Sequence, residues 1–402
     1  MNIFIALGGL MACTSLAGGR ALQPSDPHCA TRSFALPVMR YARNTHKRSP
    51  SAAVGLTNVF ALSTNKHQPG GYYIPIGVGT PPQTLDIKID TGSSDTWFFT
   101  EASCQESSCI EGWSFNPSDS STFNDIDQGA FYIQYADQSS VSGDYITDNL
   151  RIGDMTVQNL IMAIATSADS RDPYGILGLG YDTLESWADD GQRTPYKNLL
   201  DQMVEQQLID EPIFSLWLDD LGASHGVILF GGVDNTRYTG ELVTLPVVPP
   251  ESGIYNVYAV EWTYLGFQTS NGETALTADT FSVSAVLDSG TDLTWVPTAL
   301  MEEIVRILPL TTSGTSSTGV ISYTVPCSAK SDEGSFSFGF PGGLKVAVPI
   351  AEMVLPWDGD TCLWGMSAIS SGFVLGDTFL RSAYVVYDQG NNEIGLAQSA
   401  VV

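Results

Sequence analysis

Basic residues are scarce in this 402-residue chain, which has 17 Lys and Arg against 44 Asp and Glu. Nucleic acids and anionic membranes attract proteins through clustered Lys and Arg, so neither is expected as a partner. Only 15% of the residues are charged, long helical patterns are few, and Gly, Ser, Thr and β-branched residues are plentiful. This composition favours an all-β protein of two domains. The excess of carboxyl groups suits work at low pH, where protonation reduces self-repulsion.

Cysteine and histidine are also few, at six and four residues. No CxxC pair is present, and His67 and His225 alone belong to the body of the chain, so no metal site and no other cofactor are expected. The body holds four cysteines: Cys104, Cys109, Cys327 and Cys362. An even number of cysteines in a secreted chain suggests disulfides. The spacing suggests the pairs Cys104–Cys109 and Cys327–Cys362.

Long apolar runs are lacking as well. The C-terminal residues 395–402 are too short for a membrane or lipid-anchor tail, so no membrane anchor is expected. No Asn-x-Ser/Thr sequon occurs, so N-glycosylation is not expected either. The chain is expected to be a monomer. The run from Ile3 to Met11, followed by small residues, predicts a secretory signal peptide over residues 1–21, although it has no basic residue ahead of it. An ordinary buried strand is the alternative for this segment.

The few basic residues are concentrated near the start of the chain. Residues 20–48 contain six basic side chains and one acidic side chain, Asp26, whereas acidic residues predominate from Ser49 onward. Opposite charges on adjacent segments favour a propeptide, residues 22–48, that docks on the acidic body and is released in acid. Lys47-Arg48 looks like a dibasic processing site. A solvated basic tail is the alternative.

One short pattern occurs twice, as Ile89-Asp90-Thr91-Gly92-Ser93-Ser94 and as Leu287-Asp288-Ser289-Gly290-Thr291, 198 residues apart. Each copy is an apolar run that delivers an Asp, a hydroxyl residue, a Gly and another hydroxyl residue, which places the Asp where a buried strand turns sharply. Gly178 and Gly376 each follow the Asp of their own half by 88 residues. Because two features repeat in register, the sequence predicts a duplicated lobe with one Asp from each half.

Two carboxylates within hydrogen-bond reach cannot both ionise cheaply, so they share one proton. The ionised member can take a proton from water while the protonated member donates to a carbonyl. This suits amide hydrolysis by water without a covalent intermediate. Gly92 and Gly290 allow close backbone approach, and the hydroxyls of Ser93 and Thr291 can orient the carboxylates. Two turn-capping aspartates are the structural alternative.

These motifs resemble those of the pepsin-like aspartic endopeptidases, most closely the secreted fungal members, and the resemblance extends over residues 54–402. Further matches are Tyr135 in a predicted hairpin, Trp97, and the segment from Leu229 to Asp234. The resemblance implies an all-β, bilobal fold of two pseudo-symmetric lobes, residues 49–246 and 247–402, with a few short helices and a cleft between the lobes.

The resemblance also implies residue roles. Asp90 and Asp288 would activate water, while Thr91 and Ser289 would lock the two loops together. Tyr135, with Trp97 as its hydrogen-bond partner, would close over an extended peptide as part of a flap.

Four positions near this site depart from the family pattern or refine it. Asp137, at the flap tip, resembles the acidic residue by which some fungal members accept Lys before the cut bond. Ala136 and Gln138 stand where the flap usually has Gly, which should stiffen the tip. Asp292 occupies a position usually held by Ser or Thr, so it could alter subsite preference or favour a lower working pH.

Local patterns add two predicted helices, Pro195 to Ile209 and Pro297 to Leu308. Residues 222–226 match the G-x-S-x-G pattern around Ser224, but the strand that follows indicates a hairpin turn and not a serine nucleophile. The Gly-rich residues 175–180 lack the order and context of a dinucleotide loop, and close backbone packing explains them better.

The sequence therefore predicts a secreted acid endopeptidase, made as a zymogen, that cleaves proteins and peptides at extended, mainly hydrophobic segments. Its destination would be extracellular, with an acidic vacuole as the other possibility. The alternative from a different class is a catalytically silent pepsin-fold binding protein.

Overall fold

The computed structural model describes residues 52–58, 71–105, 114–169, 174–188, 193–223, 225–250 and 252–400. The predicted signal peptide and propeptide, with Lys47 and Arg48, lie outside these residues, as do Cys109 and Ser224. Strands predominate in the described chain, and its α-helices are short: α1 (Glu101–Gln105), α2 (Leu199–Glu205), α3 (Thr298–Ile307) and α4 (Asp377–Leu380). The all-β prediction is confirmed.

The strands of the first half are β1 (Ala52–Asn58), β2 (Tyr72–Val78), β3 (Gln83–Asp90), β4 (Trp97–Phe99), β5 (Asn124–Gln134), β6 (Ser140–Ile152), β7 (Met155–Asp169), β8 (Gly175–Gly178), β9 (Ile213–Trp217), β10 (His225–Phe230) and β11 (Tyr238–Pro246). Those of the second half begin with β12 (Ala259–Trp262), β13 (Tyr264–Thr269), β14 (Gly272–Ala275), β15 (Val283–Leu287), β16 (Thr294–Pro297), β17 (Thr311–Thr315) and β18 (Ile321–Pro326). They continue with β19 (Ser335–Gly339), β20 (Lys345–Pro349), β21 (Val354–Asp358), β22 (Thr361–Trp364), β23 (Met366–Ile369), β24 (Phe373–Leu375), β25 (Ala383–Asp388) and β26 (Glu393–Ser399).

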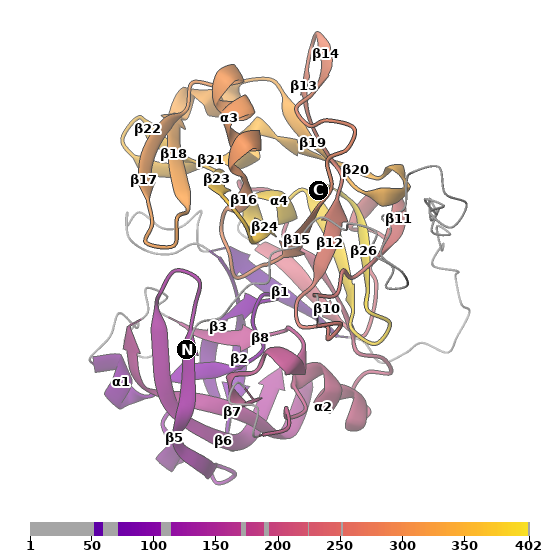
Figure 1. The fold of residues 1–402 in the computed structure, drawn as a ribbon. Coiled ribbons are helices and arrows are strands. Elements are labelled where there is room, and N and C mark those ends of the chain that lie inside the picture. The colour runs from indigo at the N-terminus through magenta and orange to yellow at the C-terminus, as the bar shows by residue number, and fades with distance from the viewer. Residues whose placement is uncertain are drawn as a thin grey trace, which may run out of the picture.

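The chain forms two β-rich bodies joined by a shared sheet (Figure 1). One sheet has the order β11-β26-β25-β9-β10-β1-β2-β3-β8-β4-β7-β6-β5, and another has the order β12-β15-β24-β16-β23-β18-β22-β21 with β17 paired to β18. A smaller sheet, β14-β13-β19-β20, covers part of the second body. Strand β2 is buried on both faces except at Pro75, as expected for an apolar strand in the middle of a sheet.

The same strand arrangement occurs once in each half. In the first half, β3 pairs parallel with β8, β8 pairs antiparallel with β4, and β4 pairs parallel with β7. In the second half, β15, β24, β16 and β23 repeat these three pairings in the same order and direction. The duplication that the repeated Asp motif predicts therefore extends to the strand pairing of the two halves. Asp90 is the last residue of β3, and Asp288 directly follows β15.

The last two strands return to the first half of the chain. Strand β25 pairs with β9, and β26 pairs with β11, both antiparallel. The sheet between the two bodies is therefore built from both ends of the described chain, and it extends across the predicted boundary near Pro246. The boundary between residues 246 and 247 stays a prediction.

The predicted helix from Pro195 to Ile209 is wrong in its extent, because α2 covers only Leu199–Glu205. Asn198 caps its start, where the side chain accepts a hydrogen bond from the Asp201 amide at 3.2 Å. Gln207 has a φ of 59°, which ends the helical path. The second predicted helix, Pro297 to Leu308, agrees with α3 to within one residue at each end.

The two sequence patterns that resemble other kinds of site, G-x-S-x-G and the Gly-rich residues 175–180, are explained by strand pairing and backbone packing. Strands β9 and β10 pair antiparallel and β10 begins at His225, which agrees with the predicted strand after the G-x-S-x-G pattern. In the other segment, a Cβ placed on Gly175 would lie 2.1 Å from the Trp97 carbonyl oxygen. Close backbone packing therefore accounts for the glycines of residues 175–180.

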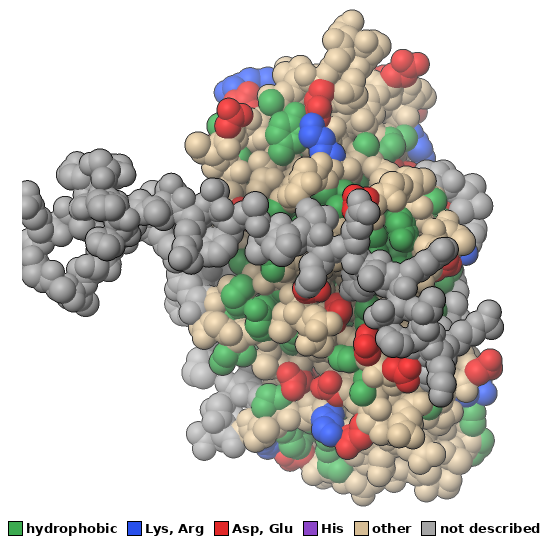
Figure 2. Space-filling view, turned by 90° about the vertical axis from the view of Figure 1, so that its right-hand side faces the viewer, with side chains coloured by type: hydrophobic (Ala, Val, Ile, Leu, Met, Phe, Trp, Pro, Cys, Tyr) green, Lys and Arg blue, Asp and Glu red, His purple; other side chains and the backbone are tan. Residues whose placement is uncertain are grey.

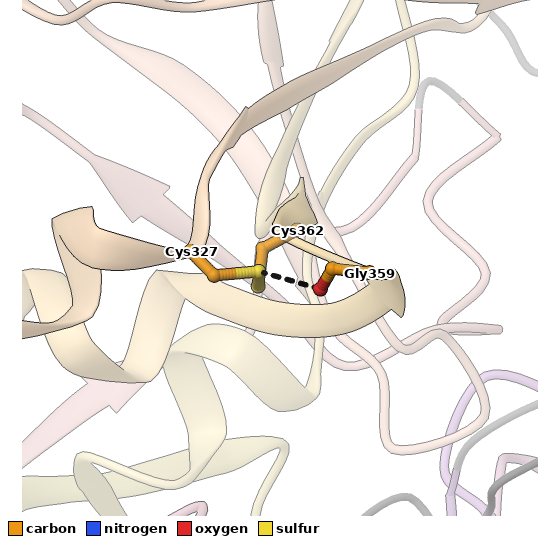
Figure 3. Close-up of a disulfide and its surroundings, with 3 residues drawn as sticks. All are labelled: Cys327, Gly359 and Cys362. Atoms are coloured by element: carbon orange, nitrogen blue, oxygen red, sulfur yellow. Dashed lines mark hydrogen bonds between the residues drawn. A yellow bond between two sulfur atoms is a disulfide. The ribbon is translucent and has the colours of Figure 1, made fainter.

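The disulfide predicted between Cys327 and Cys362 is present, with the two Cα atoms 4.9 Å apart (Figure 3). The Cys327 sulfur also lies 3.8 Å from the Gly359 carbonyl oxygen. The bond closes a loop of 35 residues, which stabilises the fold by about 3 to 4 kcal/mol in a chain-entropy account. Cys104 is disulfide-bonded too, and its predicted partner Cys109 lies outside the described residues.

Acidic side chains are spread over both bodies on the face that Figure 2 shows, and basic side chains there are few. No helix among the described residues has the length and apolar character that crossing a membrane requires.

Candidate active site

The two Asp motifs lie against each other in space. A Cβ atom placed on Gly92 would lie 2.6 Å from Cγ of Asp288. One placed on Gly290 would lie 2.2 Å from Oδ1 of Asp90. A real Cβ does not fit at such separations, so each Gly backbone is the surface against which the opposite carboxylate rests. The structure thus brings together Asp90 and Asp288 from the two bodies.

Both carboxylates are held by the same local donors. In each motif the backbone amide two residues after the Asp donates to its Oδ1, at 2.8 Å in both halves. The hydroxyl three residues after the Asp donates to Oδ2, from Ser93 to Asp90 and, at 2.6 Å, from Thr291 to Asp288. Hydrogen bonds from fixed neighbours restrict the rotation of a carboxylate, which prepares it for one geometry.

Thr91 and Ser289 join the two loops by four hydrogen bonds. The Thr91 hydroxyl donates to the Leu287 carbonyl at 2.9 Å and accepts from the Ser289 amide at 3.0 Å. The Ser289 hydroxyl accepts from the Thr91 amide at 3.2 Å and donates to the Ile89 carbonyl at 3.2 Å. Both side chains are buried. The exchange is reciprocal, so displacement of either loop breaks bonds to the other.

The glycines that follow each Asp by 88 residues pack beneath the loops. A Cβ placed on Gly178 would lie 2.4 Å from the carbonyl carbon of Ser94. One placed on Gly376 would lie 2.3 Å from the Thr291 carbonyl oxygen. Only a residue without a side chain lets these backbones approach so closely, which explains why Gly recurs at both positions.

The electrostatics of the pair favour a shared proton. Burial and the neighbouring charge of Asp90 raise the pKa of Asp288 to about 7, although hydrogen bonds from Thr291 and Gly290 act in the opposite direction. Asp288 therefore keeps its proton throughout the acidic range. One group that donates a proton beside another that accepts one is the arrangement that general acid–base hydrolysis needs.

The β5–β6 hairpin carries the predicted flap residues, and it rises toward the second body (Figure 1). Trp97 Nε1 donates to the Tyr135 hydroxyl at 2.7 Å, so the start of the hairpin turn is tied to β4. At the tip, the Asp137 carboxylate accepts from the Ser139 amide at 2.9 Å and from its hydroxyl at 2.6 Å. Gln138 has a φ of 73°, a left-handed conformation that Gly adopts more easily.

Asp292 lies beside the pair and not on the flap. Its side chain is 25% exposed, and its Oδ1 is 4.0 Å from the Lys88 ammonium. Lys88 did not stand out in the sequence, because a lone Lys in an apolar strand has no local signature.

A buried acidic cluster beneath the flap was also missed. Asp95 directly follows the first motif, and its Oδ1 accepts hydrogen bonds from the hydroxyls of Tyr145 and Tyr196, each at 3.0 Å. The Ser186 amide donates to Oδ2 at 2.7 Å. The neighbouring Glu185 accepts from the Tyr196 amide at 2.8 Å. These residues are far apart in the sequence, and only their positions in the fold form the cluster.

The cluster predicts that stability falls as the pH rises. Burial, followed by the charge of Asp95, raises the pKa of Glu185 from its ordinary value of 4.5 to about 10. A carboxyl whose folded pKa exceeds its unfolded pKa contributes stability at low pH, and this is lost as the pH rises from about 4.5 through about 10. Asp95, Asp288 and Asp377, whose pKa values burial also raises, act in the same direction.

Glu185→Gln tests this expectation, because the amide keeps an acceptor for Tyr196 but cannot ionise. Its melting temperature should match that of the unaltered chain at pH 4 and exceed it by about 2 to 4 °C at pH 7. Glu303→Gln, at an exposed position of α3, is the control and should follow the unaltered chain at both pH values. Equal melting temperatures of Glu185→Gln and the unaltered chain at pH 7 would contradict the expectation.

Comparison with known proteins agrees with this geometry. The sequence matches the family model described as eukaryotic aspartyl protease over residues 71–399. The probable aspartic-type endopeptidase opsB of Aspergillus oryzae is 37% identical over 411 residues, covering 97% of this chain and 80% of that protein. Aspartic proteinase yapsin-3 of Saccharomyces cerevisiae is 32% identical, covering 82% of this chain and 66% of that protein. Secreted aspartic protease 8 of Candida albicans is 33% identical, covering 81% of this chain and 75% of that protein.

Proposed function

Because this chain belongs to the eukaryotic aspartyl protease family and is an aspartic-type endopeptidase, we propose that Asp90 and Asp288 are its catalytic residues. The observation that carries this proposal is the contact of each carboxylate with the Gly of the opposite motif. Thr91, Gly92, Ser93, Ser289, Gly290 and Thr291 support the pair through the hydrogen bonds and close approaches described above.

In the proposed reaction, Asp90 takes a proton from a water molecule whose oxygen attacks the carbonyl carbon of the peptide. Asp288, the member with the raised pKa, donates its proton to the carbonyl oxygen. The resulting tetrahedral species has two hydroxyl groups. Asp90 then gives the proton that it took from water to the amide nitrogen, and Asp288 takes the proton of one hydroxyl group as the C–N bond breaks, which yields a carboxylic acid and an amine. No covalent intermediate forms, and the shared proton returns to the pair.

The β5–β6 hairpin supplies the proposed substrate contacts. Tyr135, held by Trp97, would lie over an extended peptide segment. Ile133 and Tyr135 pack against the buried cluster around Trp97 and Phe99, which holds the hairpin in place. The proposed preference is for extended, mainly hydrophobic segments. Asp137 would add a contact to a basic substrate side chain, and Asp292 would alter subsite preference. Cleavage of a peptide library tests this directly, because random cleavage with respect to hydrophobic residues would exclude the preference.

The secreted route and the zymogen are part of the same proposal. One relative is named a secreted aspartic protease, and the basic segment before Ser49 has the charge needed to dock on an acidic body. We expect the active protein outside the cell or at its surface, with Ser49 as its first residue after cleavage at Lys47-Arg48. N-terminal sequencing of the acid-activated protein checks this, since any other first residue excludes that processing site.

Cleavage of denatured protein at about pH 3 to 5 tests the activity. Digestion should occur in this range and should stop on addition of a peptide inhibitor that mimics the tetrahedral species. A chain that folds and binds peptides but shows no inhibitor-sensitive cleavage would be a silent binding protein. A serine hydrolase would instead lose its activity on Ser224→Ala.

A further inference from the structure

Three ionisable residues beside the candidate catalytic pair break the internal duplication. They are Lys88, Asp292 and Asp377. A shift of 198 residues, which relates Asp90 to Asp288, places their counterparts in the other half at Val286, Ser94 and Leu179. None of these counterparts can carry a charge. The backbone and the carboxylate hydrogen bonds are duplicated, but this charged cluster exists in only one copy.

Lys88 is buried in the first body, two residues before Asp90 on β3. Successive side chains of a strand alternate, so Lys88 and Asp90 project from the same face of β3. The residue is 6% exposed, and a Cβ placed on Gly71 would lie 2.7 Å from Lys88 Cε. The backbone at Gly71 therefore covers the stem of the Lys side chain. Water is excluded from one side of an ammonium group that lies next to the catalytic loops.

The ammonium group reaches across to the second body. Lys88 Nζ lies 4.0 Å from Oδ1 of Asp292, which follows the second motif. Two backbone hydrogen bonds close this loop on α4: Asp377 N to the Thr291 carbonyl at 2.9 Å, and Thr378 N to the Asp292 carbonyl at 3.2 Å. Thr291 is the residue whose hydroxyl holds Asp288. The ion pair thus connects the strand of one catalytic Asp to the loop of the other.

Arg381 and Glu352, two further charged groups near the cluster, pair with each other. Arg381 Nε donates to Glu352 at 2.6 Å, and Glu352 also accepts from the Leu221 amide at 3.0 and 3.1 Å. Burial and then the charge of Asp292 raise the pKa of Asp377, while Arg381 and Lys88 act to lower it. The remaining groups within electrostatic reach are Asp288, Asp90, Tyr72 and Tyr387. Lys88 and Asp292, by contrast, pair across the two bodies.

We propose that Lys88 and Asp292 are positioning residues that, as an ion pair, balance the electrostatic potential at the catalytic Asp pair and thereby set the pH range of cleavage. The proposal rests on the proposed function of Asp90 and Asp288. A buried ion pair contributes little net stability when compared with apolar residues of similar size, so stability alone is a weak reason for this pair. The pair also has an electrostatic effect, because it lies beside the two coupled catalytic carboxyl groups. Loss of either partner leaves an uncompensated charge that changes their protonation.

The two partners predict shifts of opposite sign. Lys88→Met removes a positive charge, which makes deprotonation of the catalytic pair harder and moves both limbs of the pH profile of kcat/KM to higher pH by about half a unit. Asp292→Asn leaves the ammonium unbalanced, which makes deprotonation easier and moves both limbs to lower pH by about the same amount. The double variant restores the balance, so its profile should return close to that of the unaltered chain.

The experiment expresses the full chain and its variants, activates them in acid, and measures kcat/KM on one peptide from pH 2 to 7 along with the melting temperature. Lys345→Met is the matched control, because Lys345 also pairs with a carboxylate, Glu273 at 2.8 Å, but on the surface of the second body. Its pH profile should not move. Should Lys88→Met fail to fold, Asp292→Asn still tests the downward shift, and Lys88→Arg should keep the original profile.

Opposite shifts with recovery in the double variant support the proposal. Shifts in the same direction, no shift, or a double variant that stays displaced would overturn it, whatever the melting temperatures, because a purely structural pair lowers stability without moving the profile in opposite directions. Failure of the proposed function gives a different result. The unaltered chain would then show no inhibitor-sensitive cleavage at any pH.

Discussion

Asp90→Asn and Asp288→Asn should each lower kcat by about 10³-fold or more while the chain stays folded. Asn has nearly the shape of Asp, and its amide oxygen still accepts from the local backbone amide. Its NH2 group can donate to the hydroxyl that bonded the second carboxylate oxygen, so the loops stay connected. It can neither take a proton from water nor hold the shared proton. The measurement is inhibitor-sensitive cleavage of one peptide near pH 4, with the melting temperature as the test of folding.

Asp279→Asn is the matched control for this pair of variants, because Asp279 is exposed on the connection before β15. It makes the same chemical change and should leave cleavage unaltered. Full activity in either catalytic variant would exclude a shared pair. A loss in one and not the other would show that the halves are not equivalent in the reaction, despite their duplicated hydrogen bonds.

Gly290→Ala should have the second largest effect. The added Cβ would lie 2.2 Å from Oδ1 and 2.5 Å from Cγ of Asp90, far inside contact distance. The Asp90 carboxylate or the second loop must move, and Thr91 and Ser289 oppose movement of the loop because they are joined reciprocally. A displacement of about 1 Å from the reactive geometry costs about 10²-fold in rate. We therefore expect kcat to fall by about this factor.

Gly314→Ala provides the comparison, since a Cβ at Gly314 on β17 meets no atom within 4 Å. It removes a Gly from the second body without crowding anything, and its rate should equal that of the unaltered chain. Gly92→Ala is the mirror-image variant and should behave like Gly290→Ala, because its Cβ would lie 2.6 Å from the Asp288 carboxylate. Normal activity in both catalytic-loop variants would mean that the loops are further apart in solution than the structure has them.

The sequence was informative where a feature is local and repeated. An apolar strand that ends in Asp, hydroxyl residue and Gly predicts a buried strand and a sharp turn, and β3 and the end of β15 have this form. Gly178 and Gly376 lie at equal distances after the two Asp residues, and the close packing beneath each loop explains why Gly occupies both positions. The disulfide between Cys327 and Cys362 and the hairpin around Tyr135 were likewise predicted from short-range patterns.

Local patterns failed where tertiary contacts compete with them. The apolar spacing from Pro195 to Ile209 suggested a long helix, but the Asn198 cap and the left-handed Gln207 confine α2 to seven residues. The return of β25 and β26 to the sheet of the first half has no sequence signal, since a strand pattern does not indicate which other strand it will pair with.

By itself, the sequence determined that the chain is β-rich, that it is duplicated, and that each half contributes one Asp with its own hydroxyl and Gly. These are properties of short segments, so residue order is enough to specify them. Only the tertiary structure decided that the two Asp residues meet, that Thr91 and Ser289 join their loops, and that Lys88 lies against Asp292. Contacts between residues some 200 positions apart depend on how the two bodies pack, and no local pattern encodes that packing.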